Sequence, residues 1–344
     1  AGMSQIALAG DSVYVNTSSL RYRTSAQIKD NNIAGNLSYG QKLERVGTSG
    51  QWTMILLNGK KYYVSSAYVT SKKTASTGAV QTTSQTAAGA QTSGGTAIAL
   101  SSNYKYANYS KINSGTATLY RSTASNKKNK VVCVNAGHGT NGGGSVKTQC
   151  HPDGSAKVTG GTTGAGATSA VAVSSGMTFA DGTAESKVTL AMAKVLKTKL
   201  LNAGYDVLMI RESDDVQLDN IARTVIANNN ADCHIALHWD STSSNKGAFF
   251  MSVPSNATYR AMEPVASHWK QHNQLGESLI SGLKSAGVKI YSKGSMEMDL
   301  TQTSYSTIPS VDIELGDKAS DHSGATLETL ANGLLAGVNT FFGQ

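Results

Sequence analysis

The stretch Val131-Val-Cys-Val-Asn-Ala-Gly-His138-Gly139 decides the fold of this chain. Its apolar, largely β-branched run predicts a buried strand, and the glycines on either side of His138 predict an open turn at the end of that strand. In open α/β sheets, ligands bind beyond the carboxyl ends of the strands, and neutral imidazole is the commonest protein ligand for metals. The stretch therefore predicts an α/β sheet with a candidate metal ligand at its edge, although a polar loop histidine fits the same pattern.

Helix-type and strand-type patterns alternate from residue 131 onward, as they do in α/β domains. We therefore expect residues 128–344 to form an open, twisted, mostly parallel sheet flanked by helices. The expected helices cover residues 185–203, 218–229, about 259–286 and 327–342, and the expected strands cover residues 205–210, 234–238, 247–253 and 310–314.

Residues 1–72 show a different pattern, of short strands separated by turns. Asn58-Gly59 between two strand-like runs predicts a hairpin. The order of Leu20-Arg-Tyr-Arg23, Trp52-Thr53 and Lys61-Tyr-Tyr-Val64 resembles the bacterial SH3 family, whose members are small all-β barrels that often bind peptidoglycan or other wall polymers. The resemblance implies an SH3-like, wall-binding domain over residues 1–72.

The segment between these two regions, residues 73–127, is expected to connect them. Residues 73–100 are rich in Thr, Ser, Ala, Gly and Gln, a composition that predicts a flexible linker because it cannot bury a core. Residues 101–127 contain several tyrosines and lysines, and we expect an extended basic lead-in to the α/β domain.

The formal net charge of +8 is concentrated in the front part of the chain. Residues 1–72 carry 8 Lys and Arg against 3 Asp and Glu, whereas residues 131–344 carry 15 against 19. A basic front part favours anionic partners such as wall polymers, although scattered charges also suit an ordinary solvated surface. No motif points to nucleic acid, and no apolar run approaches the roughly 20 residues of a membrane span.

Three further positions repeat the pattern of His138. His238 and Glu314 each follow an apolar strand-like run, and Glu185 opens a helix. Two histidines and one carboxylate with an open fourth position make a catalytic Zn²⁺ site, and a second carboxylate can serve as the general base.

These residues, in this order, are similar to the zinc-dependent N-acetylmuramoyl-L-alanine amidases of the amidase-3 type. The quoted stretch matches the first strand and GHG turn of that family, and Leu218-Asp-Asn-Ile-Ala-Arg223 resembles a later helix. The resemblance implies that His138, Glu185 and His238 bind zinc and that Glu314 is the catalytic carboxylate. It further implies a secreted, wall-associated autolysin that cleaves the amide between muramic acid and L-alanine of peptidoglycan.

The chain departs from the family pattern beside the predicted site. Asn135 and the glycine-rich run after His138 stand where the family commonly has aspartates, and the separation between His138 and Glu185 is 185 − 138 = 47 positions. The added segment, about residues 145–183, is expected to be a lid, a substrate-selecting loop or a surface excursion. We expect Arg223 to be structural and to pair with an acid near the sheet edge.

Two alternatives compete with a zinc amidase. A zinc carboxypeptidase is disfavoured because its first histidine and glutamate would be about three residues apart. A non-catalytic wall-binding protein is disfavoured because all four polar positions are retained. The remaining polar and aromatic side chains near these motifs are expected to have ordinary roles: His234 in the core or a turn, His151, His268, His272 and His322 on the surface, Asp240, Glu297 and Asp299 in loops, and Trp239 and Trp269 in packing.

Overall fold

The computed structural model describes residues 11–71, 92 and 94–344, and these residues fall into two compact units. The expected linker over residues 73–91 lies outside the described residues. In the described part of the chain, no helix is both long and apolar enough to cross a membrane.

The first unit, within residues 11–71, is an antiparallel β domain. Its sheet has the strand order β3-β2-β6-β5-β4-β1-β7, and β5 and β6 meet at the hairpin predicted at Asn58-Gly59. Alternate residues of these strands, including Val13, Leu43 and Ile55, form its apolar core. The resemblance to SH3 domains stays a prediction. The strands are β1 (Asp11–Val15), β2 (Ser19–Arg23), β3 (Ile33–Ser38), β4 (Lys42–Ser49), β5 (Trp52–Leu57), β6 (Lys60–Ser65) and β7 (Val69–Thr70), with 3-10 turns at Asp30–Asn32 and Ser66–Tyr68.

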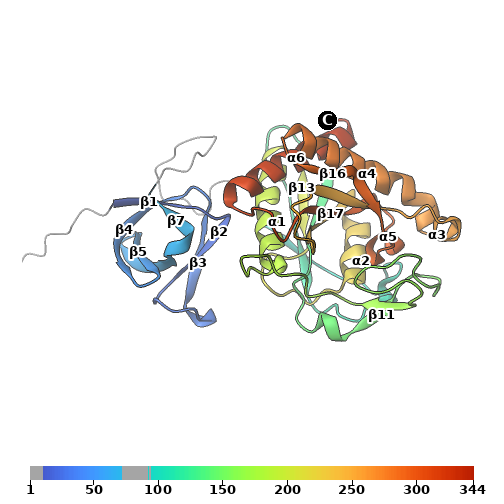
Figure 1. Cartoon of the computed structure of the whole chain (residues 1–344), viewed down its shortest axis with the longest axis horizontal. Coiled ribbons are helices and arrows are strands. Elements are labelled where there is room, and N and C mark those ends of the chain that lie inside the picture. Colours follow the sequence, from blue (N-terminus) through green and yellow to red (C-terminus); the bar gives the residue numbers. More distant parts are fainter. Residues whose placement is uncertain (1–10, 72–91, 93) are drawn as a thin grey trace, which may run out of the picture. The chain divides into compact units, whose positions relative to one another are not determined.

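The second unit is a mixed sheet flanked by helices (Figure 1). Its strand order is β16-β15-β17-β14-β10-β13-β9-β8, and the four central strands are mutually parallel. Three of the outer pairings are antiparallel, so the sheet is less uniformly parallel than the sequence predicts. The strands are β8 (Thr96–Ala99), β9 (Thr116–Tyr120), β10 (Val131–Ala136), β13 (Asp206–Met209), β14 (Cys233–Asp240), β15 (Ala248–Ser252), β16 (Ile290–Glu297) and β17 (Ser310–Asp317), and a separate pair is β11 (Lys147–Gln149) with β12 (Ser169–Val171).

The helices that follow β10 and β13 lie on opposite faces of the sheet. The spatial order of the three strands is β14, β10, β13. The chain therefore crosses the sheet in one direction from β10 to β13 and in the opposite direction from β13 to β14. Because both crossovers are right-handed, their two helices lie on opposite faces. The face that includes Cys133 and Leu208 packs against Ala222 and Ile226 of the second helix. The helices are α1 (Glu185–Asn202), α2 (Asn220–Asn230), α3 (Ala257–Ala261), α4 (Val265–Ser285), α5 (Thr301–Tyr305) and α6 (Gly324–Phe342), with 3-10 turns at Ala107–Tyr109 and Gly143–Ser145.

Two expectations about these elements are wrong, and one strand was not expected. The expected helix over 259–286 is two helices, α3 and α4, because Pro264 precedes α4 and its ring disfavours a helical residue before it. The boundary expected at residue 128 is too late, since β8 and β9 from the expected linker and lead-in extend the sheet beside β13. The strand β16 was not expected, because Ile290–Glu297 carries few apolar residues and lies at the sheet edge.

Candidate active site

The two predicted histidines come from adjacent parallel strands. His138 lies in the turn after β10, and His238 lies near the end of β14, which pairs with β10. His138 has a φ of 67°, a left-handed conformation that is uncommon outside glycine. A Cβ on Gly137 would lie 2.3 Å from Cε1 of His238, so the glycine before His138 allows the two histidines to approach each other.

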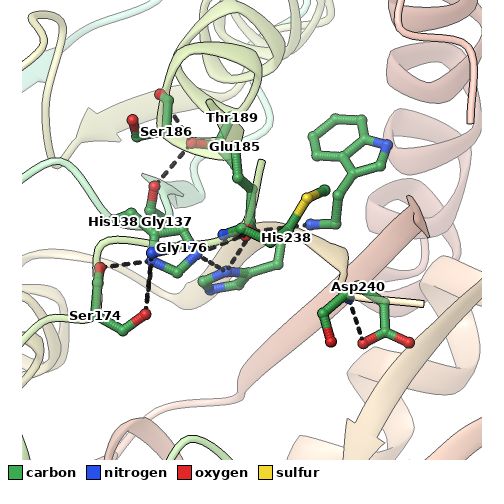
Figure 2. Close-up of polar contacts among 12 residues, drawn as sticks. Gly137, His138, Ser174, Gly176, Glu185, Ser186, Thr189, His238 and Asp240 are labelled. Carbon is green, nitrogen blue, oxygen red and sulfur yellow. Dashed lines mark hydrogen bonds and ion pairs between the residues drawn. The ribbon is translucent and has the colours of Figure 1, made fainter. Parts of the chain in front are cut away.

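Glu185, the first residue of α1, joins these histidines in a tight triangle (Figure 2). Its Oε2 lies 2.9 Å from Nε2 of His138 and 3.3 Å from Nδ1 of His238, and the two nitrogens are 3.2 Å apart. In a tetrahedral site with ligand distances of about 2.1 Å, neighbouring ligand atoms stand about 3.4 Å apart. The triangle therefore has nearly the size of one face of a zinc coordination shell, and its nitrogen and oxygen donors suit zinc.

The end of the 145–183 insertion supports two members of this triangle. Nδ1–H of His138 donates to the backbone carbonyl of Ser174 over 2.7 Å, which leaves Nε2 facing Glu185. The backbone N–H of Met177 donates to Oε1 of Glu185 over 3.1 Å. Between them, Gly176 has a φ of 84°, and a Cβ there would lie 2.9 Å from Cδ2 of His138. This segment is therefore part of the site.

The carboxylate of Glu185 is ionised toward the two imidazoles. Burial disfavours its charged form, but hydrogen bonds with His138 and His238 hold its pKa well below the usual range. Burial likewise disfavours a charged His238, yet the hydrogen bond with Glu185 and the nearby Asp312 raise the pKa of His238 to about 9. The ionised Glu185 thus provides a negative charge that attracts a cation, and His238 would release a proton when a metal binds.

Two carboxylates on β17 face the same site from the other side of His238. Glu314 stands beside His238 in the register between β14 and β17, and Asp312, two residues earlier, shares its face of the strand. Burial raises the pKa of both carboxyls. Oδ1 of Asp312 and Oε2 of Glu314 are buried with no hydrogen-bond partner among the described residues. The sequence reasoning missed Asp312, and the signal for it was its position two residues before Glu314.

The predicted role of Arg223 is correct in kind but wrong in its partner. Its side chain is fully buried and donates to the backbone carbonyl of His138 over 2.8 Å and to that of Ala136 over 3.2 Å. It also donates to Oδ1 of Asn135 over 3.1 Å, and no ion pair in the described part of the chain includes it. Arg223 therefore fixes the turn of His138 by donating to backbone carbonyl oxygens. It forms no ion pair at position 135, because this chain has the amide Asn135 there and not an acid.

Asn135 also explains the state of His234. Its Nδ2 lies 3.1 Å from Nε2 of His234, which is buried on β14. Burial and the charge of Arg223 lower the pKa of His234 to about 3, so this neutral ring accepts from the amide. The prediction of a core histidine is confirmed.

Two histidines expected on the surface are buried. His272 accepts from the backbone N–H of Ser310 over 3.0 Å. His151, in the insertion, lies 2.7 Å from Oδ2 of Asp299, and both side chains are 1% exposed. Asp299 also accepts from the backbone N–H of Val158 over 2.9 Å, so this pair attaches the insertion to the loop before α5. Hydrophobic periodicity cannot detect such polar pairs, which form between distant segments.

The triangle lies in a cleft of ≈ 600 Å³. One wall comes from the insertion, including Lys157 and Thr162, and another comes from residues 298 and 300–302. His238, Asp312 and Glu314 also line this cleft. A polymer segment therefore has room to enter beside the candidate metal ligands.

Comparison with known proteins gives a match to one family over the second unit. A family profile described as N-acetylmuramoyl-L-alanine amidase matches residues 132–332. No curated protein sequence matches the chain. The solved N-acetylmuramyl-L-alanine amidase of Mycobacterium smegmatis has a TM-score of 0.53 and 16% identity, and the match covers 64% of this chain and 99% of that chain. The solved enzyme of Mycobacterium abscessus has a TM-score of 0.46 and 20% identity, with 62% of this chain and 98% of that chain covered. The N-acetylmuramoyl-L-alanine amidase of Clostridium difficile 630 has a TM-score of 0.45 and 17% identity, with 62% and 97% covered. At these identities, the first of them supports a shared fold.

Proposed function

Because the chain belongs to the N-acetylmuramoyl-L-alanine amidase family, we propose that it is a zinc-dependent hydrolase that cleaves the amide between muramic acid and L-alanine in peptidoglycan. Its metal ligands would be His138, Glu185 and His238, and Glu314 would be its general base. The observation that carries this proposal is the triangle of three donor atoms, 2.9 to 3.3 Å apart, beside the strand β17, on which Glu314 pairs with His238.

The chemistry divides between the ion and the chain. Bound zinc polarises a carbonyl and lowers the pKa of a water molecule to about 7. Glu314 would accept the proton of the attacking water on its Oε2, which no described residue engages. It would then deliver that proton to the departing amine of L-alanine, as a general base that turns general acid. Ser174 and Met177 hold His138 and Glu185 in place while this happens.

The first unit would retain the enzyme at its substrate. We propose that it binds the cell wall outside the cell and that its basic charge, 8 Lys and Arg against 3 Asp and Glu over residues 1–72, attracts anionic wall polymers. Binding of the full chain to sacculi should then weaken as salt increases and after the anionic polymers are removed. Binding that depends on neither would contradict this part of the proposal.

Mass spectrometry of digested peptidoglycan tests the reaction. The wild-type chain should contain zinc and release stem peptides with a free L-alanine amine. E314Q should retain zinc and lose cleavage by about 100-fold or more, since general acid–base catalysis contributes roughly 10²–10⁴-fold. The matched control is E297Q, which changes an exposed glutamate outside the cleft and should cleave normally. Cleavage by E314Q at the wild-type rate would refute the assigned base.

A further inference from the structure

Asp312 is a largely buried acid that the proposed reaction does not use. Its side chain is 16% exposed, and its Oδ2 lies 3.6 Å from Nε2 of His238. Within the described ranges, its Oδ1 has no hydrogen-bond partner, and no ion pair joins it to a lysine or arginine. A carboxylate kept there only for stability would have a closer partner, because burial without one costs free energy.

The geometry of His238 indicates what Asp312 faces. Nδ1 of His238 points to Glu185 and His138, over 3.3 and 3.2 Å. The opposite ring nitrogen, Nε2, therefore faces Asp312. A histidine can present a lone pair at only one nitrogen when its neutral ring carries a proton on the other, so the position of that proton decides whether Nδ1 can bind a metal.

The same arrangement occurs at His138 with the ring nitrogens exchanged. There, Nδ1–H donates to the carbonyl of Ser174, and Nε2 faces the triangle. Each histidine thus has an acceptor behind the nitrogen that points away from the site. Such outer acceptors orient metal-bound histidines and select their tautomer.

We propose that Asp312 is a positioning residue that holds the proton of His238 on Nε2 and so directs Nδ1 to the metal. The distance of 3.6 Å exceeds that of a direct hydrogen bond, so the interaction in this state is the attraction between the carboxylate and the N–H dipole. The inference rests on the proposed function, because it assumes that the triangle binds zinc.

Zinc affinity, measured on the full chain by competition with a coloured chelator, tests this role. Loss of such an outer partner typically costs 10–100-fold in metal affinity, so we expect about 10-fold weaker binding for D312N and about 100-fold for D312L. The matched control is D240N, which removes the same charge near the end of β14 from a carboxylate that pairs with Lys246 over 2.6 Å. Its zinc affinity should equal that of the wild type.

Two further readouts separate positioning from a merely structural role. Nitrogen NMR of the zinc-free wild type, recorded at a pH at which the ring of His238 is neutral, should show the single proton of that ring on Nε2. Under the same conditions, D312L should show a mixture of tautomers. Because Oδ1 of Asp312 is buried without a hydrogen-bond partner among the described residues, zinc-free D312L should unfold at the same denaturant concentration as the wild type or a higher one. Equal zinc affinity of D312L and D240N would overturn the inference and leave the proposed function intact, whereas a wild-type chain without zinc affinity would overturn both.

Discussion

Replacing Gly176 by alanine should damage the site through two separable effects. Gly176 has a φ of 84°, and its missing side chain leaves room for two of the proposed ligands. An alanine Cβ would lie 2.9 Å from Cδ2 of His138 and 3.1 Å from Oε1 of Glu185. Gly182, in the same insertion, has a φ of 88°, but nothing lies within 4 Å of its Cβ position. G182A is therefore a control with the same backbone strain and no contact.

The magnitudes follow from these distances. A left-handed backbone costs a non-glycine residue roughly 1–2 kcal/mol, so both variants should lose about that much stability. Two carbon atoms are in ordinary contact from 3.4 Å, so in G176A the ring of His138 must move away from the new Cβ by about 0.5 Å. Functional groups must be held within about 0.5 Å of their productive positions. We therefore expect the zinc affinity and amidase activity of G176A to fall about 10- to 100-fold, the loss typical when a residue that orients a metal ligand is mutated.

Both variants should be measured as full chains by urea unfolding, chelator competition and peptide release from sacculi. G182A should match the wild type in zinc affinity and activity despite its lower stability. If G176A keeps the zinc affinity and activity of G182A, the insertion does not support the ligands, and the reasoning from Gly176 is wrong.

Two further predictions concern buried histidines outside the triangle. Burial lowers the pKa of His272 to about 3, below the value near 6.5 of an unfolded chain, so the unfolded state binds an additional proton below about pH 6.5 and stability falls as the pH decreases toward 3. H272N retains an acceptor for the backbone N–H of Ser310. Between pH 4 and 6, the plot of unfolding free energy against pH should be less steep for H272N by about 1.4 kcal/mol per pH unit, as measured by urea unfolding. An equal slope for H272N and the wild type would contradict the lowered pKa of His272. H151A removes the side chain that lies 2.7 Å from Oδ2 of the buried Asp299. It should cost about 1–3 kcal/mol and expose the 145–183 segment to protease. A loss below about 1 kcal/mol, with unchanged proteolysis, would contradict a role in attaching the insertion.

Much of the fold was predictable because its signals are local. The strand 131–136, helix α1 and the strand before His238 each have an apolar periodicity that neighbouring residues determine. The missed elements, β8, β9 and β16, lie toward the edges of the sheet, and none of them has a long apolar run. Their strand structure depends on pairing with neighbours that are distant in sequence, which periodicity does not report.

The sequence by itself determined the α/β class and the four polar positions at the ends of strands and the start of a helix, because parallel strands bring their carboxyl ends to one edge. Only the tertiary structure decided which groups stand behind them. Ser174 behind His138, Asp312 behind His238, and the carbonyl oxygens held by Arg223 all depend on contacts between separate segments. Such contacts act over a few ångströms in space and leave no periodic trace in the chain, so they become visible only once the segments are packed together.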